Sequence, residues 1–109
     1  MNALVTGIAG FVGSTLAERL VADGWNVVGV DSVTPYYDVS QKHQNLEAVV
    51  AAGAIVHDLD LRTADLSALL DEADVVFHQA GQPGVRASWA DFDSYVEHNV
   101  LVTQRLLEA

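Results

Sequence analysis

The chain has 109 residues, of which 50% are hydrophobic and 18% charged, enough apolar material for the packed core of one small domain. Acidic residues outnumber Lys and Arg by 15 to 5 and give a formal net charge of -10, which excludes a nucleic-acid duplex or an anionic membrane surface as a partner. The absence of cysteine excludes disulfides and thiolate chemistry, and the absence of a basic leader or a long apolar run predicts a cytoplasmic protein.

Short apolar runs alternate with segments of helical period, a pattern typical of βαβ units around a parallel sheet. Residues 3–7 are predicted as a short buried strand. The segment 13–23 is predicted as a helix ended by Gly24, with its apolar face formed by Leu16, Leu20 and Val21. Residues 25–31 are hydrophobic almost without interruption, as in a strand that is covered on both faces.

The second half of the chain continues the same alternation. Residues 39–52 are predicted as a helix, 54–61 as a strand and its end, 64–72 as a short helix and 74–81 as a fourth strand. A final helix is expected from about 92 to 109, with an apolar stripe formed by Val96, Val100, Thr103 and Leu107. We therefore predict an α/β fold, the N-terminal half of a Rossmann-type doubly wound parallel sheet, with strand order 3-2-1-4.

Three glycines, Gly7, Gly10 and Gly13, stand at the junction of the first strand and the first helix. In this context Gly7 permits a tight turn, Gly10 lets a pyrophosphate approach the backbone, and Gly13 lets the helix pack closely. The free N–H groups at the helix start would then face the phosphates. The alternative is that the glycines only cap a turn.

Asp31, at the end of the second predicted strand, is placed to accept hydrogen bonds from both hydroxyls of an adenosine ribose. A 2′-phosphate would meet its negative charge, and no Arg or Lys follows Asp31 before Lys42, so the site favours NAD over NADP. An aspartate that merely begins a turn is the alternative.

Asp58 and Asp60, at the end of the third strand, each offer a carboxylate for an adenine amino group. We prefer Asp60 with Leu61, because the strand ends here and only one of the two carboxylates is expected to face the cofactor. A solvated loop without a ligand is the alternative.

The stretch TGIAGFVG, with its Gly-x-x-Gly-x-x-Gly spacing, resembles the extended short-chain dehydrogenase/reductases. Together with VDSVTPYYDVSQK, VVFHQAGQPGVRASW and YVEHNVLVTQRLLEA, the chain is similar over nearly its whole length to the nucleotide-sugar epimerase and dehydratase branch, in particular to UDP-glucuronate and UDP-glucose 4-epimerases. The resemblance implies bound NAD and a UDP-sugar substrate, and the acidic charge argues against a nucleic acid or membrane partner.

The resemblance also implies roles for individual residues. The pyrophosphate would meet the backbone of Phe11 and Val12, the ribose would meet Asp31 and Ser32, and the adenine would meet Asp60 and Leu61. The remaining cofactor contacts would come from Gln79, Ala80, Gly81 and Asn99. Asn99 has the alternative of being a polar residue on a helix surface.

Arg86 lies in QPGVRASW, where the family presents a loop to the sugar nucleotide. Its guanidinium is suited to a diphosphate or to the carboxylate of a uronic acid, and an ordinary surface arginine is the alternative. The four histidines, His43, His57, His78 and His98, lack the spacing of a metal site, and we expect no metal.

The family's catalytic base, a Tyr-x-x-x-Lys pair, is missing from this sequence. Tyr36, Tyr37 and Tyr95 are followed at the fourth position by Ser40, Gln41 and Asn99. We expect residues 1–109 to be the N-terminal part of an NAD-binding domain, inactive alone, with the catalytic and substrate-binding remainder absent.

The parent enzyme would oxidise the sugar at C4 to a 4-keto intermediate and return the hydride to the other face. A dehydratase or decarboxylase fragment and a non-catalytic NAD-binding sensor are the alternatives. A homodimer is also expected, either through the last helix with Val100, Val102 and Leu106, or with those residues covering the sheet instead.

Overall fold

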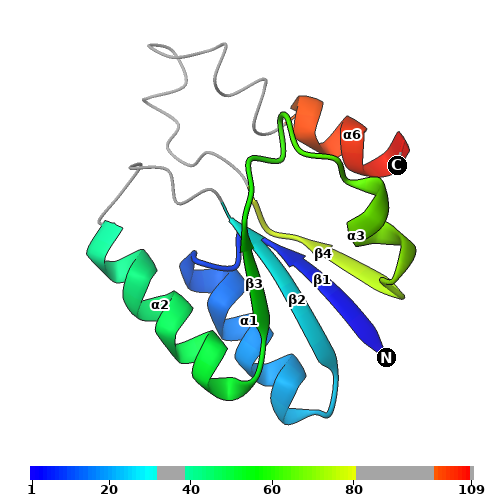
Figure 1. The fold of residues 1–109 in the computed structure, drawn as a ribbon. Helices are drawn as coiled ribbons and strands as arrows, with labels where there is room; N and C mark the ends of the chain where they lie inside the picture. Colours follow the sequence, from blue (N-terminus) through cyan, green and yellow to red (C-terminus); the bar gives the residue numbers. More distant parts are fainter. Residues whose placement is uncertain (32–38, 81–99, 109) are drawn as a thin grey trace.

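The fold was analysed in a computed structural model that describes residues 1–31, 39–80 and 100–108. Its centre is a sheet of four strands, β1 (Asn2–Thr6), β2 (Asn26–Asp31), β3 (Ile55–Asp58) and β4 (Val75–His78). The strand order is β3-β2-β1-β4 and every neighbouring pair is parallel (Figure 1). The predicted α/β fold and strand order are confirmed.

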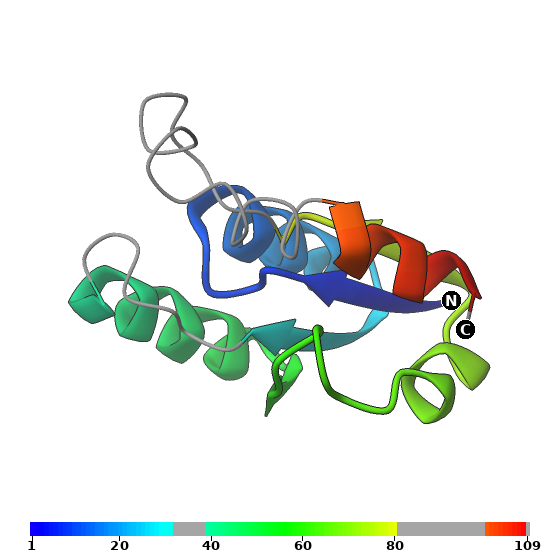
Figure 2. The ribbon, with the colours of Figure 1, turned by 90° about the horizontal axis from the view of Figure 1, so that it is seen from above.

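Within the described ranges, four helices flank the sheet, α1 (Phe11–Ala22), α2 (Val39–Ala52), α3 (Ser67–Asp71) and α6 (Val102–Glu108). Helices α1 and α2 lie on one side of the sheet, and α3 and α6 lie on the other (Figures 1 and 2). The strands are therefore covered on both faces, which explains why β1 and β2 are hydrophobic almost without interruption.

The alternation of side chains along β1 divides the core into two parts. Ala3 and Val5 point toward α1 and α2 and join a cluster with Ile8, Ala17, Leu20, Val27, Val49 and Ala54. Leu4 points to the opposite face and joins a cluster with Val30, Leu61, Leu66 and Val102. Thr6 is fully buried on the same face of the sheet as Leu4, which is the face that α6 covers.

Helix boundaries differ from the sequence-based prediction at two places. Helix α1 begins at Phe11 rather than at Gly13, because Gly10 takes the extended N-cap conformation. Helix α3 begins only at Ser67, because the Asp65 carboxylate accepts hydrogen bonds from the Ser67 N–H at 3.1 Å and its hydroxyl at 2.7 Å and forms a turn there. At the other end of α1, Gly24 has the φ of 91° that the prediction of a glycine C-cap requires.

The apolar stripe predicted for the last helix is wrong over the described residues. Val100 is 58% exposed and Leu107 is 81% exposed, whereas Val102 is buried and Leu106 packs against the sheet. The buried face of α6 is formed by Val102 and Leu106, four residues apart, whereas Val100 and Leu107 lie on the exposed face. Val102 therefore covers the sheet, and Val96 lies outside the described residues.

Gly29, in the middle of β2, makes room for the side chain of Ile8. A Cβ at position 29 would lie 2.1 Å from Ile8 Cδ1 and 2.8 Å from Ile8 Cβ, and Ile8 is fully buried. Since Ile8 follows the turn at Gly7, the missing side chain in β2 fixes how closely this turn approaches the sheet. Sequence analysis did not single out Gly29.

Replacing Gly29 with alanine is expected to lower the free energy of unfolding by about 1–3 kcal/mol, because the new methyl group overlaps Ile8. The double variant Gly29→Ala/Ile8→Val, which removes the Cδ1 methyl, is expected to lose less than the sum of the two single variants. Denaturant titration of the three variants measures this coupling. Strict additivity would contradict the contact.

Among the described residues, no helix has the length and apolar character needed to cross a membrane.

Candidate functional site

The carboxyl ends of all four strands lie at one edge of the sheet, because the strands are parallel (Figure 1). The glycine turn follows β1 there, Asp31 ends β2, the segment from Leu59 to Ala64 follows β3, and Gln79 and Ala80 follow β4. In open α/β sheets this edge is where ligands bind. The structure thus brings together the described residues that the sequence predicted as cofactor contacts.

The turn after β1 requires glycine at Gly7 in the turn itself and at Gly13 in the first turn of α1, which packs against it. Gly7 has a φ of 68°, and its N–H donates to the Val30 carbonyl at 2.9 Å. A Cβ on Gly7 would lie 2.8 Å from the Ala80 nitrogen, and a Cβ on Gly13 would lie 2.2 Å from the Gly7 carbonyl oxygen. The turn is therefore held tightly between α1 and the segment after β4.

Helix α1 begins with N–H groups that no side chain of the described part of the chain caps. Gly10 is the N-cap residue and makes no side-chain hydrogen bond to the helix. Phe11 is 78% exposed and Val12 is 58% exposed, so the first turn is open to solvent. With no acidic residue in this turn, the partial positive charge of the helix end is available to an anion.

Ala9, within the glycine turn, is held on both sides of its backbone. Its N–H donates to Asp31 Oδ2 at 3.0 Å, and its carbonyl oxygen accepts from Asn45 Nδ2 at 2.9 Å. Ala9 itself is fully buried. Residues of β2 and α2 therefore fix the conformation of the turn, and such order lowers the entropy cost of binding at a site.

Asp31 lies against the only lysine of the chain. Lys42 Nζ is 3.8 Å from Asp31 Oδ1, and the two side chains are 8% and 9% exposed. Sequence analysis treated Lys42 as remote, and it also missed Asn45. The sequence contains a pattern that could have indicated both contacts. Lys42, Asn45, Leu46 and Val49 follow a helical period and so lie on one face of α2, the face that packs on the sheet.

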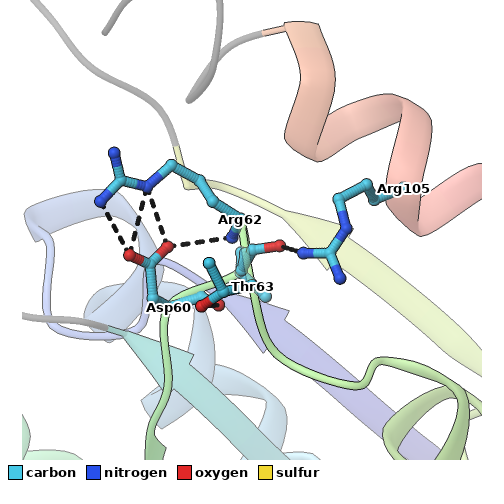
Figure 3. A network of polar contacts seen from close by, with 5 residues as sticks. Asp60, Arg62, Thr63 and Arg105 are labelled. Atoms are coloured by element: carbon cyan, nitrogen blue, oxygen red, sulfur yellow. Dashed lines mark hydrogen bonds and ion pairs between the residues drawn. The ribbon is translucent and has the colours of Figure 1, made fainter.

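Figure 3 shows the polar contacts after β3. Arg62 pairs with Asp60, with Nη2 at 2.8 Å from Oδ2, and its backbone N–H donates to Oδ1 at 2.9 Å. From α6, Arg105 donates to the Leu61 carbonyl and, at 2.6 Å, to the Ala64 carbonyl. The segment that the sequence predicts at the adenine is thus tied to the last helix.

His78 forms a corresponding connection at the end of β4. Its Nδ1 lies 2.7 Å from Thr6 Oγ1, and its Nε2 lies 3.1 Å from Thr103 Oγ1 on α6. The Ala80 N–H donates to the same Thr6 hydroxyl oxygen at 3.1 Å. Burial lowers the pKa of His78 below the usual histidine value of 6.5, so the neutral ring is favoured.

Several predicted residues lie outside the described part of the chain, namely Ser32, Gly81, Arg86 and Asn99. Asp58, the alternative to Asp60, is exposed at the end of β3 and pairs in register with Asp31. His43 and His57 are exposed, and within the described ranges no group of three or more metal-ligating side chains is assembled.

The sequence of the chain matches a known protein family. The sequence profile of the NAD dependent epimerase/dehydratase family matches residues 3–109. The chain belongs to this family. Every element of the site described above lies within the matched range.

Two curated members of the family match the chain along its whole length. One is the protein named "Uncharacterized UDP-glucose epimerase YtcB" from Bacillus subtilis, 45% identical over 112 residues that cover 100% of this chain and 35% of the relative. Another is "Probable UDP-glucuronate 4-epimerase" from Rhizobium meliloti, 41% identical, covering 99% of this chain and 33% of the relative. The chain spans about a third of these relatives' length.

Solved structures of family members have the same fold. UDP-glucuronic acid 4-epimerase from Bacillus cereus, in complex with UDP-glucuronic acid and NAD, aligns with a TM-score of 0.93 at 41% identity and covers 99% of this chain and 35% of that one. Its complex with NAD alone aligns with a TM-score of 0.89 at 38% identity, with the same coverage.

Proposed function

We propose that this chain forms the NAD-binding part of a nucleotide-sugar 4-epimerase that acts on UDP-glucuronate or UDP-glucose. The observation that carries the proposal is the open, glycine-lined start of α1 beside the Asp31 carboxylate, in a member of the NAD-dependent epimerase/dehydratase family. The Bacillus cereus complexes, which hold NAD and UDP-glucuronic acid, support it.

The residues present fit a dinucleotide. A Cβ at Gly7 or Gly13 would overlap neighbouring backbone, so the turn can only be this tight without side chains, and a tight turn lets a pyrophosphate approach α1. The chain has a net charge of -10, so backbone N–H groups are the suitable local ligand for phosphates. Asp31, at the neighbouring strand end, offers oxygens for the hydroxyls of a ribose.

In this proposal the N–H groups of Phe11 and Val12 hold the pyrophosphate, and the Asp31 carboxylate orients the adenosine ribose. Asp60 and Leu61 bind the adenine, and Gln79, Ala80 and Gly81 lie along the nicotinamide ribose. Ser32 and Asn99 complete the cofactor contacts. NAD, when bound, supplies a hydride acceptor for C4 of the sugar. The proton acceptor for the sugar hydroxyl must come from residues beyond this sequence, which has no Tyr-x-x-x-Lys pair.

We propose accordingly that residues 1–109 are the N-terminal part of the cofactor domain and that a following segment supplies the base and most sugar contacts. The share of the relatives that the chain spans, about a third, supports this division. Arg86 is proposed to pair with the diphosphate or with a uronate carboxylate. A homodimer of the whole protein remains part of the proposal.

Chromatographic separation of the sugar nucleotides, followed by mass spectrometry of each fraction, distinguishes the candidate activities. The whole protein is expected to release NAD on denaturation and to convert UDP-glucuronate or UDP-glucose into an isomer of unchanged mass. A product lighter by one water would indicate a dehydratase, and one lighter by CO₂ a decarboxylase. Bound NAD without turnover of either sugar would favour a sensor, and a protein that retains no NAD would contradict the proposal.

A further inference from the structure

The hydrogen bonds around His78 fit a neutral ring that carries its proton on Nε2. The Ala80 N–H donates to Thr6 Oγ1, so the Thr6 hydroxyl proton is free to be donated to His78 Nδ1. When Nδ1 accepts this proton, the proton of the neutral ring lies on Nε2 and is donated to Thr103 Oγ1, 3.1 Å away. This arrangement of protons satisfies all three contacts with a neutral ring, the form that burial of His78 favours.

The contacts form a continuous connection from α6 to the segment after β4. Thr6 and His78 are partners in the register of β1 and β4, and Thr6 is fully buried. Ala80 lies directly above the glycine turn, where a Cβ on Gly7 would be 2.8 Å from its nitrogen. The Thr6 hydroxyl therefore fixes the distance between the Gln79–Ala80 backbone and the glycine turn.

We propose that His78 is a positioning residue for the cofactor site, whose neutral, Nε2-protonated ring holds the Gln79–Ala80 backbone against Gly7 through the Thr6 hydroxyl. The inference rests on the proposed NAD site, since Gln79 and Ala80 are placed there beside the nicotinamide ribose. The ring touches neither cofactor nor substrate in this account. It acts only by orienting the hydroxyl that binds Ala80.

Protonation of His78 breaks the arrangement. Below the lowered pKa of the ring, Nδ1 becomes a donor and no longer accepts the Thr6 hydroxyl proton. Among the described residues, the charged side chains on α6 are Arg105 and Glu108, which bind the Leu61 and Ala64 carbonyls and the Gln104 amide respectively. β1 carries no charged side chain, and Asp74, just before β4, binds the Asn2 N–H. Among the described residues, the contacts of the ring are the Thr6 and Thr103 hydroxyls, and burial lowers its pKa.

The test uses the whole protein, with the dissociation constant for NAD measured between pH 5 and 8. His78→Phe, which removes both ring nitrogens, is expected to weaken NAD binding about five- to tenfold at pH 7.5. His78→Asn keeps an acceptor near the position of Nδ1 and is expected to restore most of the affinity. Wild-type affinity is expected to fall as the pH drops through the lowered pKa of His78, whereas the affinity of His78→Asn is expected to stay constant there.

A second measurement does not depend on NAD binding. In protein with ¹⁵N-labelled histidine, the ring of His78, assigned by its loss in His78→Asn, is expected to be protonated on Nε2 and unprotonated on Nδ1 at pH 7.5. The opposite tautomer would overturn the proposal. So would NAD affinities of His78→Phe and wild type that agree at every pH. A wild-type protein that binds no NAD would instead contradict the proposed function.

Discussion

Gly13→Ala is expected to lower the affinity for NAD at least about 100-fold and the free energy of unfolding by roughly 3 kcal/mol. The reason is that the added Cβ would lie 2.2 Å from the Gly7 carbonyl oxygen. Both positions are fixed by the backbone, so no side-chain rotation can relieve the overlap. Helix α1 must then move away from the turn, and its first N–H groups move with it. Calorimetric titration with NAD and thermal unfolding of the same samples measure the two losses.

Gly24→Ala is the matched control at the other end of α1. An added Cβ there meets no atom within 4 Å, so the variant bears only the cost of φ at 91°. That cost is about 1–2 kcal/mol of stability, and NAD affinity is expected to stay at the wild-type value. Equal NAD affinities for Gly13→Ala and Gly24→Ala would contradict the role assigned to the glycine turn.

Asp31→Asn is expected to weaken NAD binding about 10- to 100-fold, because hydrogen bonds between the ribose hydroxyls and a carboxylate are replaced by weaker ones to an amide. The amide oxygen can still accept from the Ala9 N–H, so the turn is expected to keep its shape. Asp23→Asn removes the same charge from the exposed end of α1 and should leave NAD affinity unchanged.

Asp31→Asn should also narrow the preference for NAD over NADP. The repulsion between the carboxylate and a 2′-phosphate is lost, while the Lys42 ammonium, 3.8 Å from the Asp31 carboxylate in the wild type, stays in place. Titration of the wild type and the variant with both nucleotides gives the ratio of dissociation constants. If the substitution leaves the ratio of the NAD and NADP dissociation constants unchanged, Asp31 does not discriminate between a 2′-hydroxyl and a 2′-phosphate.

The sheet order and most elements were predictable because their signals are local. Gly24 and Gly53 end helices, β1 and β2 are hydrophobic on both faces, and α2 has the predicted bounds of Val39 and Ala52. The handedness of parallel crossovers then leaves few arrangements. The last helix was harder, since its sequence has apolar residues on two faces, and packing against the sheet selects the face of Val102 and Leu106 over that of Val100 and Leu107.

The parts of the candidate site that depend on a local sequence pattern were predictable. Contacts between residues far apart in sequence were much less so. Gly7 and Gly13 are recognisable from spacing alone, and so is an acidic residue at the end of β2. The pairing of Lys42 with Asp31 and of Asn45 with Ala9 depends on how α2 docks. Arg105 reaches the Leu61 and Ala64 carbonyls across more than forty positions of sequence, as their separations of 44 and 41 residues show.

The structure of the purified whole protein with its bound nucleotide tests the central claim most directly. We predict NAD with its pyrophosphate at the N–H groups of Phe11 and Val12 and its adenosine ribose on Asp31. A dinucleotide bound away from the start of α1, or a protein that holds no nucleotide at saturating NAD, would contradict the account.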